Sequence, residues 1–199
     1  MHRFIFFALI AAASASYVTY DGPCPAVKPV DNFDFAAFQG RWYETARYPS
    51  PHEGGLKGKC TVADYLVYGS TGRVKNSQVI DGVKLYTEGD IAQYAPGVIM
   101  YTYTYNGVSK NFFLTILDTD YTSYAIGYSC KYFPYTNKHE VYSWILSRNL
   151  VLEPYARAAV DNYLNVCPVL DASKYVTNDY SPETCIAPFV GLITNFRQL

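Results

Sequence analysis

The sequence predicts an all-β fold: an eight-stranded antiparallel up-and-down β-barrel with one C-terminal α-helix packed outside it. Between Gly40 and Ser147, short apolar runs follow one another with turn signals at regular spacing. Most of the connections are short, which favours antiparallel neighbours. Only one later segment, beginning at Pro154, has the period of an amphipathic helix. Eight such strands can close into a barrel that has no exposed edge and a narrow interior.

The N-terminus has the layout of a secretory signal peptide. The basic pair "HR" precedes an apolar run over residues 4–10, and "ASA" at residues 13–15 is a small-residue cleavage site. The apolar run is too short to be a membrane helix. We therefore expect residues 1–15 to be removed and residues 16–199 to form a single secreted, extracellular domain with one core.

The eight expected strands end at recognisable turn signals. Pro49 ends the first, the run Gly69-Ser70-Thr71-Gly72 ends the second, and Asp81-Gly82 joins the third to the fourth. Asn106-Gly107 joins the fifth to the sixth, and these two residues suit the positive φ angles of a type I′ hairpin. The strands are, in order, residues 41–49, 60–68, 73–80, 83–91, 97–105, 108–117, 121–130 and 140–147.

One helix and one apolar extension follow the strands. Pro154 suits a first helical turn, and Pro168 ends the helix. A single apolar stripe would bury the helix against the barrel; it consists of Ala156, Ala159, Val160, Tyr163 and Leu164. Residues 186–199 form an apolar extension that Pro188 and Gly191 interrupt. The extension is too short to span a membrane, and we expect it to pack against the barrel wall rather than contact lipid.

Charge and residue types argue against several functions. The formal net charge of −1 disfavours nucleic acid or an anionic membrane as a partner. No segment of the mature chain is long enough to span a bilayer. The mature chain has only His52 and His139 as histidines and has no Cys-x-x-Cys pair, so we expect no metal site. We find no converging Ser-His-Asp or paired-carboxylate arrangement and expect no enzyme.

From Tyr101 to Tyr105 the sequence places a tyrosine at every second position, with threonines between them. Because side chains alternate across a strand, Tyr101, Tyr103 and Tyr105 share one face. If they point inward, they either fill a solid core or line a pocket. Buried hydroxyls need hydrogen-bond partners, and a filler core would more simply use Leu, Val and Ile. We therefore favour a pocket, in which each ring offers a ligand an apolar face and a hydroxyl.

Three short motifs, in the right order for this barrel, resemble the conserved blocks of the lipocalins. They are Gly40-Arg41-Trp42 at the first strand, Thr119-Asp120-Tyr121 before the seventh, and Arg148 after the eighth. Longer stretches, among them "YAIGYSCKY" and "AVDNYLNVCPVLD", resemble the insect bilin-binding protein and insecticyanin group, which is apolipoprotein D-like. The likeness runs from about Asp21 to Cys185.

The resemblance implies a lipocalin calyx with specific structural residues. In this family a tryptophan plugs the closed end of the barrel and an arginine packs across it, which gives Trp42 and Arg148 structural roles. In a secreted chain the five cysteines indicate disulfides with one left over, and spacing alone leaves several pairings open. The family's pairing carries over as Cys24–Cys130 and Cys60–Cys185. Cys167 is then the odd thiol, which we expect to pack as a small apolar residue.

The resemblance also implies the ligand and the side chains that meet it. The ligand would be biliverdin or a related bilin, held non-covalently for pigment sequestration, transport or coloration. Asn76 and Gln78 would meet its lactam or pyrrole groups, and Lys110, Lys131 and the rim loop Pro49 to Lys59 would meet its propionates. The full ligand-binding set is Asn76, Gln78, Leu85, Thr87, Tyr101, Tyr103, Tyr105, Val108, Lys110, Phe112, Leu114, Ser129, Lys131, Glu140, Tyr142 and Trp144.

The sequence departs from the bilin-binding relatives at two of these positions. Gln78 stands where they carry a histidine and Phe112 where they carry a polar residue, so the pocket is more apolar. Gly54-Gly55-Leu56 lengthens the rim loop. A carrier of another small hydrophobic ligand, such as a retinoid, carotenoid or fatty acid, is therefore the alternative. A structural or protein-interaction role is a third interpretation, and a homo-oligomer is a further candidate partner. A bilin carrier isolated from its source would be blue to blue-green, whereas a colourless protein would indicate a lipid carrier or a binding partner.

Overall fold

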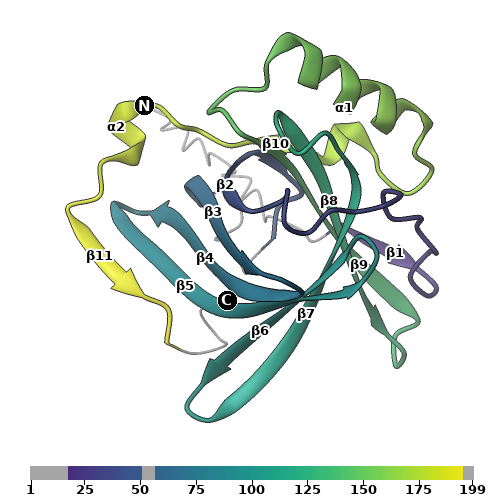
Figure 1. Ribbon diagram of the computed structural model, residues 1–199, viewed down its shortest axis with the longest axis horizontal. Coiled ribbons are helices and arrows are strands. Elements are labelled where there is room, and N and C mark those ends of the chain that lie inside the picture. Colours follow the sequence, from purple (N-terminus) through teal and green to yellow (C-terminus); the bar gives the residue numbers. More distant parts are fainter. Residues whose placement is uncertain (1–17, 51–56, 195–199) are drawn as a thin grey trace, which may run out of the picture.

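The computed structural model describes residues 18–50 and 57–194, and its main feature is a closed barrel (Figure 1). The predicted signal peptide, His52 and the Gly54-Gly55-Leu56 insertion lie outside the described residues. The barrel strands are β2 (Gly40–Arg47), β3 (Lys59–Tyr68), β4 (Thr71–Ile80), β5 (Val83–Ala95), β6 (Val98–Tyr105), β7 (Val108–Thr119), β8 (Tyr124–Phe133) and β9 (Lys138–Ser147). Each lies within a few residues of a predicted strand, so the predicted fold class is confirmed.

Antiparallel pairing runs around the whole barrel. Each strand from β2 to β9 pairs with the next, and β9 returns to β2, where Tyr43 lies opposite Ser147. The β6–β7 hairpin turns at Asn106 and Gly107, whose φ angles are 52° and 76°. Positive φ at both central residues defines the type I′ geometry that this dipeptide predicted.

Helix α1 (Pro154–Val166) lies across the outside of the barrel (Figure 1). Its Ala156 and Val160 are buried in an outer core against large side chains of β8, and Cys167 packs at the edge of the same core. The β8 side chains in this core are Tyr124, Ile126 and Tyr128. Pro154 starts the helix and Val166 ends it two residues before Pro168, as the sequence predicted.

Short elements frame the barrel. They are β1 (Thr19–Asp21), which pairs with β9; the 3₁₀ helix η2 (Ala172–Lys174); β10 (Val176–Thr177), which pairs with β2; α2 (Pro182–Cys185); and β11 (Phe189–Leu192), which pairs with β5. The sequence predicted none of them as separate elements, because runs of two to four residues have no readable period. The described part of the apolar extension packs against the barrel wall, where Phe189–Leu192 form a parallel strand. Residues 195–199 lie outside the described residues.

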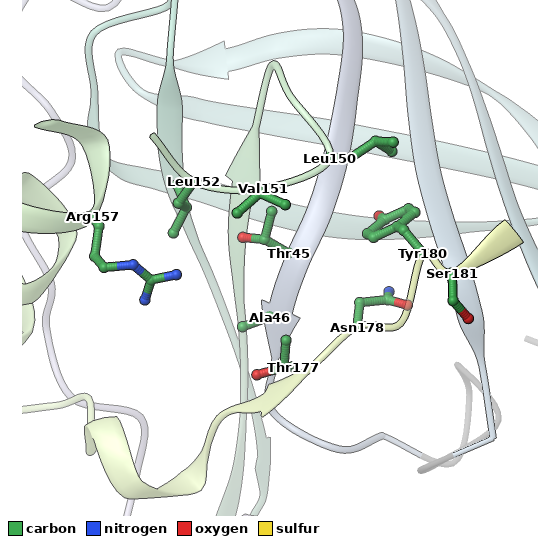
Figure 2. A pocket seen from close by; sticks show the side chains of 10 residues that line it. All are labelled: Thr45, Ala46, Leu150, Val151, Leu152, Arg157, Thr177, Asn178, Tyr180 and Ser181. Atoms are coloured by element: carbon green, nitrogen blue, oxygen red, sulfur yellow. The ribbon is translucent and has the colours of Figure 1, made fainter. Parts of the chain in front are cut away.

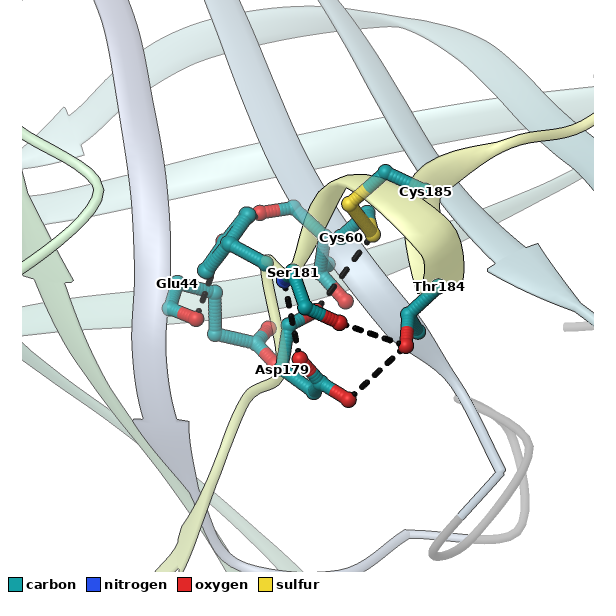
Figure 3. Close-up of a disulfide and its surroundings, with 8 residues drawn as sticks. Glu44, Cys60, Asp179, Ser181, Thr184 and Cys185 are labelled. Carbon is teal, nitrogen blue, oxygen red and sulfur yellow. Dashed lines mark hydrogen bonds between the residues drawn. A yellow bond between two sulfur atoms is a disulfide. The ribbon is translucent and has the colours of Figure 1, made fainter.

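Two disulfides fasten the segments before and after the barrel to it. Cys24–Cys130 ties the N-terminal arm to β8, and Cys60–Cys185 ties the start of β3 to α2. Figure 3 shows the second of these with the hydrogen bonds that hold α2. The Asp179 carboxylate accepts from the Ser181 backbone N–H and from the Thr184 hydroxyl, each at 2.9 Å. The C-terminal extension therefore starts from a fixed point.

The closed end of the barrel is built on Trp42. Its side chain is fully buried, and its indole N–H donates to the Phe38 carbonyl at 2.9 Å. The guanidinium carbon of Arg148 lies 3.6 Å from the centre of the Trp42 ring. Arg148 also donates to the carbonyl oxygens of Gln39, Arg41 and Tyr121. The plug is thus a cation–π contact surrounded by backbone acceptors.

Asp120, in the second of the three motifs, organises the loop before β8. Its Oδ1 accepts hydrogen bonds from the backbone N–H groups of Thr122, Ser123 and Tyr124 at 2.7–3.1 Å. Partial burial raises the pKa of the carboxyl, but these hydrogen bonds outweigh it and lower the pKa below its ordinary value. The motif therefore has a structural role at the closed end, close to the carbonyl of Tyr121 that Arg148 binds.

Candidate ligand-binding site

Strand register brings the residues predicted as ligand contacts onto the inner face of the barrel. Asn76 lies opposite Thr87, and Tyr101 lies opposite Phe112. Directly opposed residues share a face of the sheet, so each pair extends the same surface. The other pairs on this face are Gln78–Leu85, Tyr103–Lys110, Tyr105–Val108, Ile99–Leu114, Gly127–Trp144, Ser129–Tyr142 and Lys131–Glu140. All sixteen predicted positions therefore belong to the inner face of the barrel.

The three tyrosines of β6 point into the barrel. Tyr101 and Tyr103 are buried with their ring centres 6.4 Å apart, and Tyr105 is half-buried. Each hydroxyl forms a hydrogen bond with a side chain of another strand. The Tyr101 hydroxyl pairs with that of Tyr65 at 2.5 Å, the Tyr103 hydroxyl with the Asn76 amide at 2.8 Å, and the Tyr105 hydroxyl with that of Thr87. Burial raises the pKa of Tyr65 to about 12 and that of Tyr101 well above its ordinary value. Both hydroxyls are therefore neutral at physiological pH.

Exposure of the inner face rises toward the β6–β7 hairpin. Along β7, the inward side chains of Ile116 and Leu114 are 0% and 7% exposed, whereas those of Phe112 and Val108 are 45% and 55% exposed. Two strands further along the wall, the inward residues of β9 are half-buried; they are Glu140, Tyr142 and Trp144. Solvent therefore reaches the inner face in the half of the barrel that carries the hairpin.

The sequence left two interpretations of the β6 tyrosines, a solid core and a lined pocket, and each one describes a different half of the barrel. Toward Trp42, the interior is a packed core in which Tyr101 and Tyr103 join Phe38, Tyr65 and several aliphatic side chains. Toward the hairpin, the inner face is lined but open to solvent. The packed half supports the lining residues from below, and the open half is the part of the interior that solvent reaches.

Polar groups on the open half are few and differ in character. Gln78 is buried, and its Oε1 accepts no hydrogen bond from any residue that the structure describes. The Tyr142 hydroxyl donates to Glu140 Oε2 at 2.5 Å. Lys110 and Lys131 are exposed at the rim, where Lys131 Nζ lies 4.8 Å from the centre of the Phe133 ring. A buried acceptor and rim cations suit a ligand that carries N–H groups and acidic ends.

Two charged residues of β2 complete the inner wall, and the sequence reasoning missed them. Arg47 donates to Glu44 Oε1 at 2.7 Å and to the Gly58 carbonyl at 3.0 Å, and both side chains are almost fully buried. Alternation from Trp42 could have placed Glu44 inside. A bulge between Glu44 and Ala46 then shifts the strand by one residue, which turns Arg47 inward as well.

A separate pocket of about 370 Å³ lies outside the barrel, between β2, the start of α1 and the segment around β10 (Figure 2). Its lining residues are Thr45, Ala46, Leu150, Val151, Leu152, Arg157, Thr177, Asn178, Tyr180 and Ser181. None of the predicted ligand residues is among them. Two of its polar groups already hold the fold together, because Thr45 donates to the Ile145 carbonyl and Tyr180 to the Glu44 carbonyl. The inner face of the barrel remains the candidate site.

Within residues 18–50 and 57–194, no group of three or more His, Cys, Asp or Glu side chains could hold a metal ion. The same residues contain no helix that is long and apolar enough to cross a membrane. What they do contain is a barrel plugged by an arginine-covered tryptophan at one end and lined by aromatic and amide side chains at the other. This architecture defines a β-barrel carrier of small hydrophobic ligands.

The chain belongs to the lipocalin / cytosolic fatty-acid binding protein family, whose model matches residues 39–178. It is 43% identical to a bilin-binding protein of Pieris brassicae over 93% of this chain and 98% of that protein. It is 41% identical to insecticyanin-B of Manduca sexta over 93% of each chain. A solved Manduca sexta insecticyanin structure matches it with a TM-score of 0.85 and 38% identity, over 90% of this chain and 98% of the other. Rat (Rattus norvegicus) apolipoprotein D is 32% identical over 79% of this chain and 82% of that protein.

Proposed function

We propose that this protein is a secreted carrier that binds a bilin, a biliverdin-like tetrapyrrole, non-covalently in the open half of its barrel. The observation that carries this proposal is the inner face itself, which is aromatic, partly polar and open to solvent, in a chain 43% identical to a bilin-binding protein. The function would be pigment sequestration, transport or coloration. It requires binding and no bond-making, so the protein acts as a carrier and not as an enzyme.

The chemistry of the lining suits a flat conjugated ligand. Rings of Tyr105, Phe112 and Trp144 offer apolar faces against which a tetrapyrrole can stack. The buried Oε1 of Gln78 is an acceptor for a pyrrole or lactam N–H, and such a bond would remove the cost of leaving it unbonded. At the rim, Lys110 and Lys131 are placed to meet propionates. These are the roles that we propose for the predicted site residues.

Secretion is part of the same proposal. The predicted signal peptide at residues 1–15 and the two disulfides, Cys24–Cys130 and Cys60–Cys185, support it, because disulfides persist in oxidising compartments. Both disulfides join a segment outside the barrel to a barrel strand.

A carrier of another small hydrophobic ligand is the second candidate, and one observation favours it. Phe112 and Val108 present exposed apolar side chains on the inner face near the mouth, which a fatty acid, retinoid or carotenoid could cover. The similarity to apolipoprotein D supports the same alternative. The two candidates share the site and differ in the ligand.

Titration of the recombinant protein with biliverdin distinguishes the two candidates. We expect saturable binding with a Kd below about 10 μM, which corresponds to about −7 kcal/mol. The readouts are a change in the pigment's visible absorbance and quenching of tyrosine and tryptophan fluorescence. A fluorescent fatty acid, titrated alone and in competition with biliverdin, is the control. Saturable fatty-acid binding together with no saturable biliverdin binding would favour the second candidate.

A further inference from the structure

The barrel wall has a gap between β5 and β6, where the two strands no longer pair. The pairing of these two strands runs from Ala95 opposite Val98 to Asp90 opposite Thr102 and ends there. The first residues of β5, Val83 to Tyr86, have no partner on β6. They belong to the open half of the barrel, because Leu85 lies opposite Gln78 on the inner face.

Strand β11 occupies this gap. Phe189 to Leu192 pair in parallel with Val83 to Tyr86, and the Ile193 backbone N–H donates to the Tyr86 carbonyl at 2.9 Å. In Figure 1, β11 (yellow) runs beside the free part of β5. Because β11 takes up the hydrogen bonds that β6 leaves, it extends the sheet by one strand where the ligand would enter.

One face of β11 continues the inner face of the barrel. Gly191 lies opposite Leu85, and a Cβ on Gly191 would come within 3.0 Å of the Leu85 side chain. Alternation then places Ile193 on the same inner side and Leu192 on the outer side. Exposure agrees with this assignment, since the Ile193 side chain is 5% exposed and that of Leu192 is 51% exposed.

The disulfide Cys60–Cys185 sets where this strand can reach. It fixes α2 to the start of β3, and only three residues separate Cys185 from Phe189 (Figure 3). The Asp179 carboxylate, bonded to Ser181 and Thr184, holds the other side of the short helix. The segment that leads into β11 is therefore fixed at α2, which limits where β11 can lie relative to β5.

We propose that β11 is part of the ligand-binding wall and that Ile193 is a ligand-contacting residue that determines specificity at the mouth. Ile193 places an apolar side chain on the inner side, and the absence of a Cβ on Gly191 lets β11 lie close to the Leu85 side chain. A bulky residue at position 191 would press on the Leu85 side chain and change the inner face at this point. The assignment of Ile193 as a ligand contact rests on the proposed carrier function; the placement of β11 on β5 does not.

The test compares I193A with L192A, its neighbour on the outer side, in the full-length protein. Biliverdin and a fluorescent fatty acid are titrated into wild type and both variants, and melting temperatures verify that each is folded. We expect I193A to bind about tenfold more weakly, because apolar contact area is lost. L192A should bind like wild type. We expect G191L to weaken the binding of biliverdin more than the binding of the slender fatty acid. If I193A binds both ligands as tightly as L192A and wild type do, Ile193 is not a ligand contact.

Hydrogen exchange separates a failure of this inference from a failure of the proposed function. In a chain that ends at Pro188, we expect faster amide exchange within Val83–Tyr86 than in the full-length protein, and unchanged exchange in β8. This readout needs no ligand. If wild type binds neither ligand, the carrier function fails, while slowed exchange in the full-length chain still supports β11 as a wall strand. Equal exchange in both chains would overturn the placement of β11.

Discussion

Replacing Trp42 with alanine is expected to lower the free energy of unfolding by about 3–5 kcal/mol, the cost typical of removing a large buried aromatic side chain. The residue is fully buried and its ring stacks on Phe38 at 5.0 Å. Its removal also takes away the surface that Arg148 covers at 3.6 Å. Since small domains have only about 5–15 kcal/mol of stability, W42A is expected to lose a large part of the stability of the fold.

Chemical denaturation followed by circular dichroism measures this effect. The matched control is Y68A, which removes an aromatic ring from an exposed position on β3 and is expected to change stability by less than about 0.5 kcal/mol. W42F keeps a ring at the plug and should recover part of the loss. A change below about 1 kcal/mol for W42A would show that the closed end is not held by this side chain.

Replacing Arg47 with methionine is expected to cost about 3–5 kcal/mol, because Glu44 would keep its charge in a buried place without the guanidinium. The two side chains are 2% and 6% exposed. Asn178 also donates to Glu44 Oε1, at 3.2 Å, but a neutral amide does not balance the charge. R47M therefore leaves a buried carboxylate that must either stay charged at high cost or take up a proton.

A double-mutant cycle isolates the coupling between the two residues. R47M, E44Q and the R47M/E44Q double variant are unfolded in urea at neutral pH. We expect the double variant to be more stable than R47M alone, because the second change removes the buried charge. If the two single effects simply add, Glu44 and Arg47 are not energetically coupled and the ion pair has no special role in the inner wall.

The sequence predicted the barrel well because its strands are long and its turns carry strong local signals. Asn106-Gly107 marked a type I′ hairpin and Pro154 marked the helix start, and both are where they were expected. Alternation along β6 was sufficient to place Tyr101 and Tyr103 on one face. These features depend on local backbone geometry, which a single sequence can show.

Features that depend on contacts between distant segments could not be predicted. Arg47 faces inward because of a bulge, and a bulge is set by how β2 meets β9. The partner of the Tyr101 hydroxyl, Tyr65, became evident only from the fold. Strand β11 was read only as an apolar extension, because four residues show no period and the free edge of β5 cannot be seen in the sequence.

One measurement tests the central claim, that the inner face of β6 forms part of the ligand-binding surface. It is the biliverdin affinity of the Y103A/Y105A variant, compared with that of T102A/T104A, which alters the outer face of the same strand. We expect Y103A/Y105A to lose about 1–3 kcal/mol of binding free energy if stacking on nucleic-acid bases is a fair guide. T102A/T104A should bind like wild type. Equal affinity in both variants, each shown to be folded, would contradict an inward-facing aromatic binding surface.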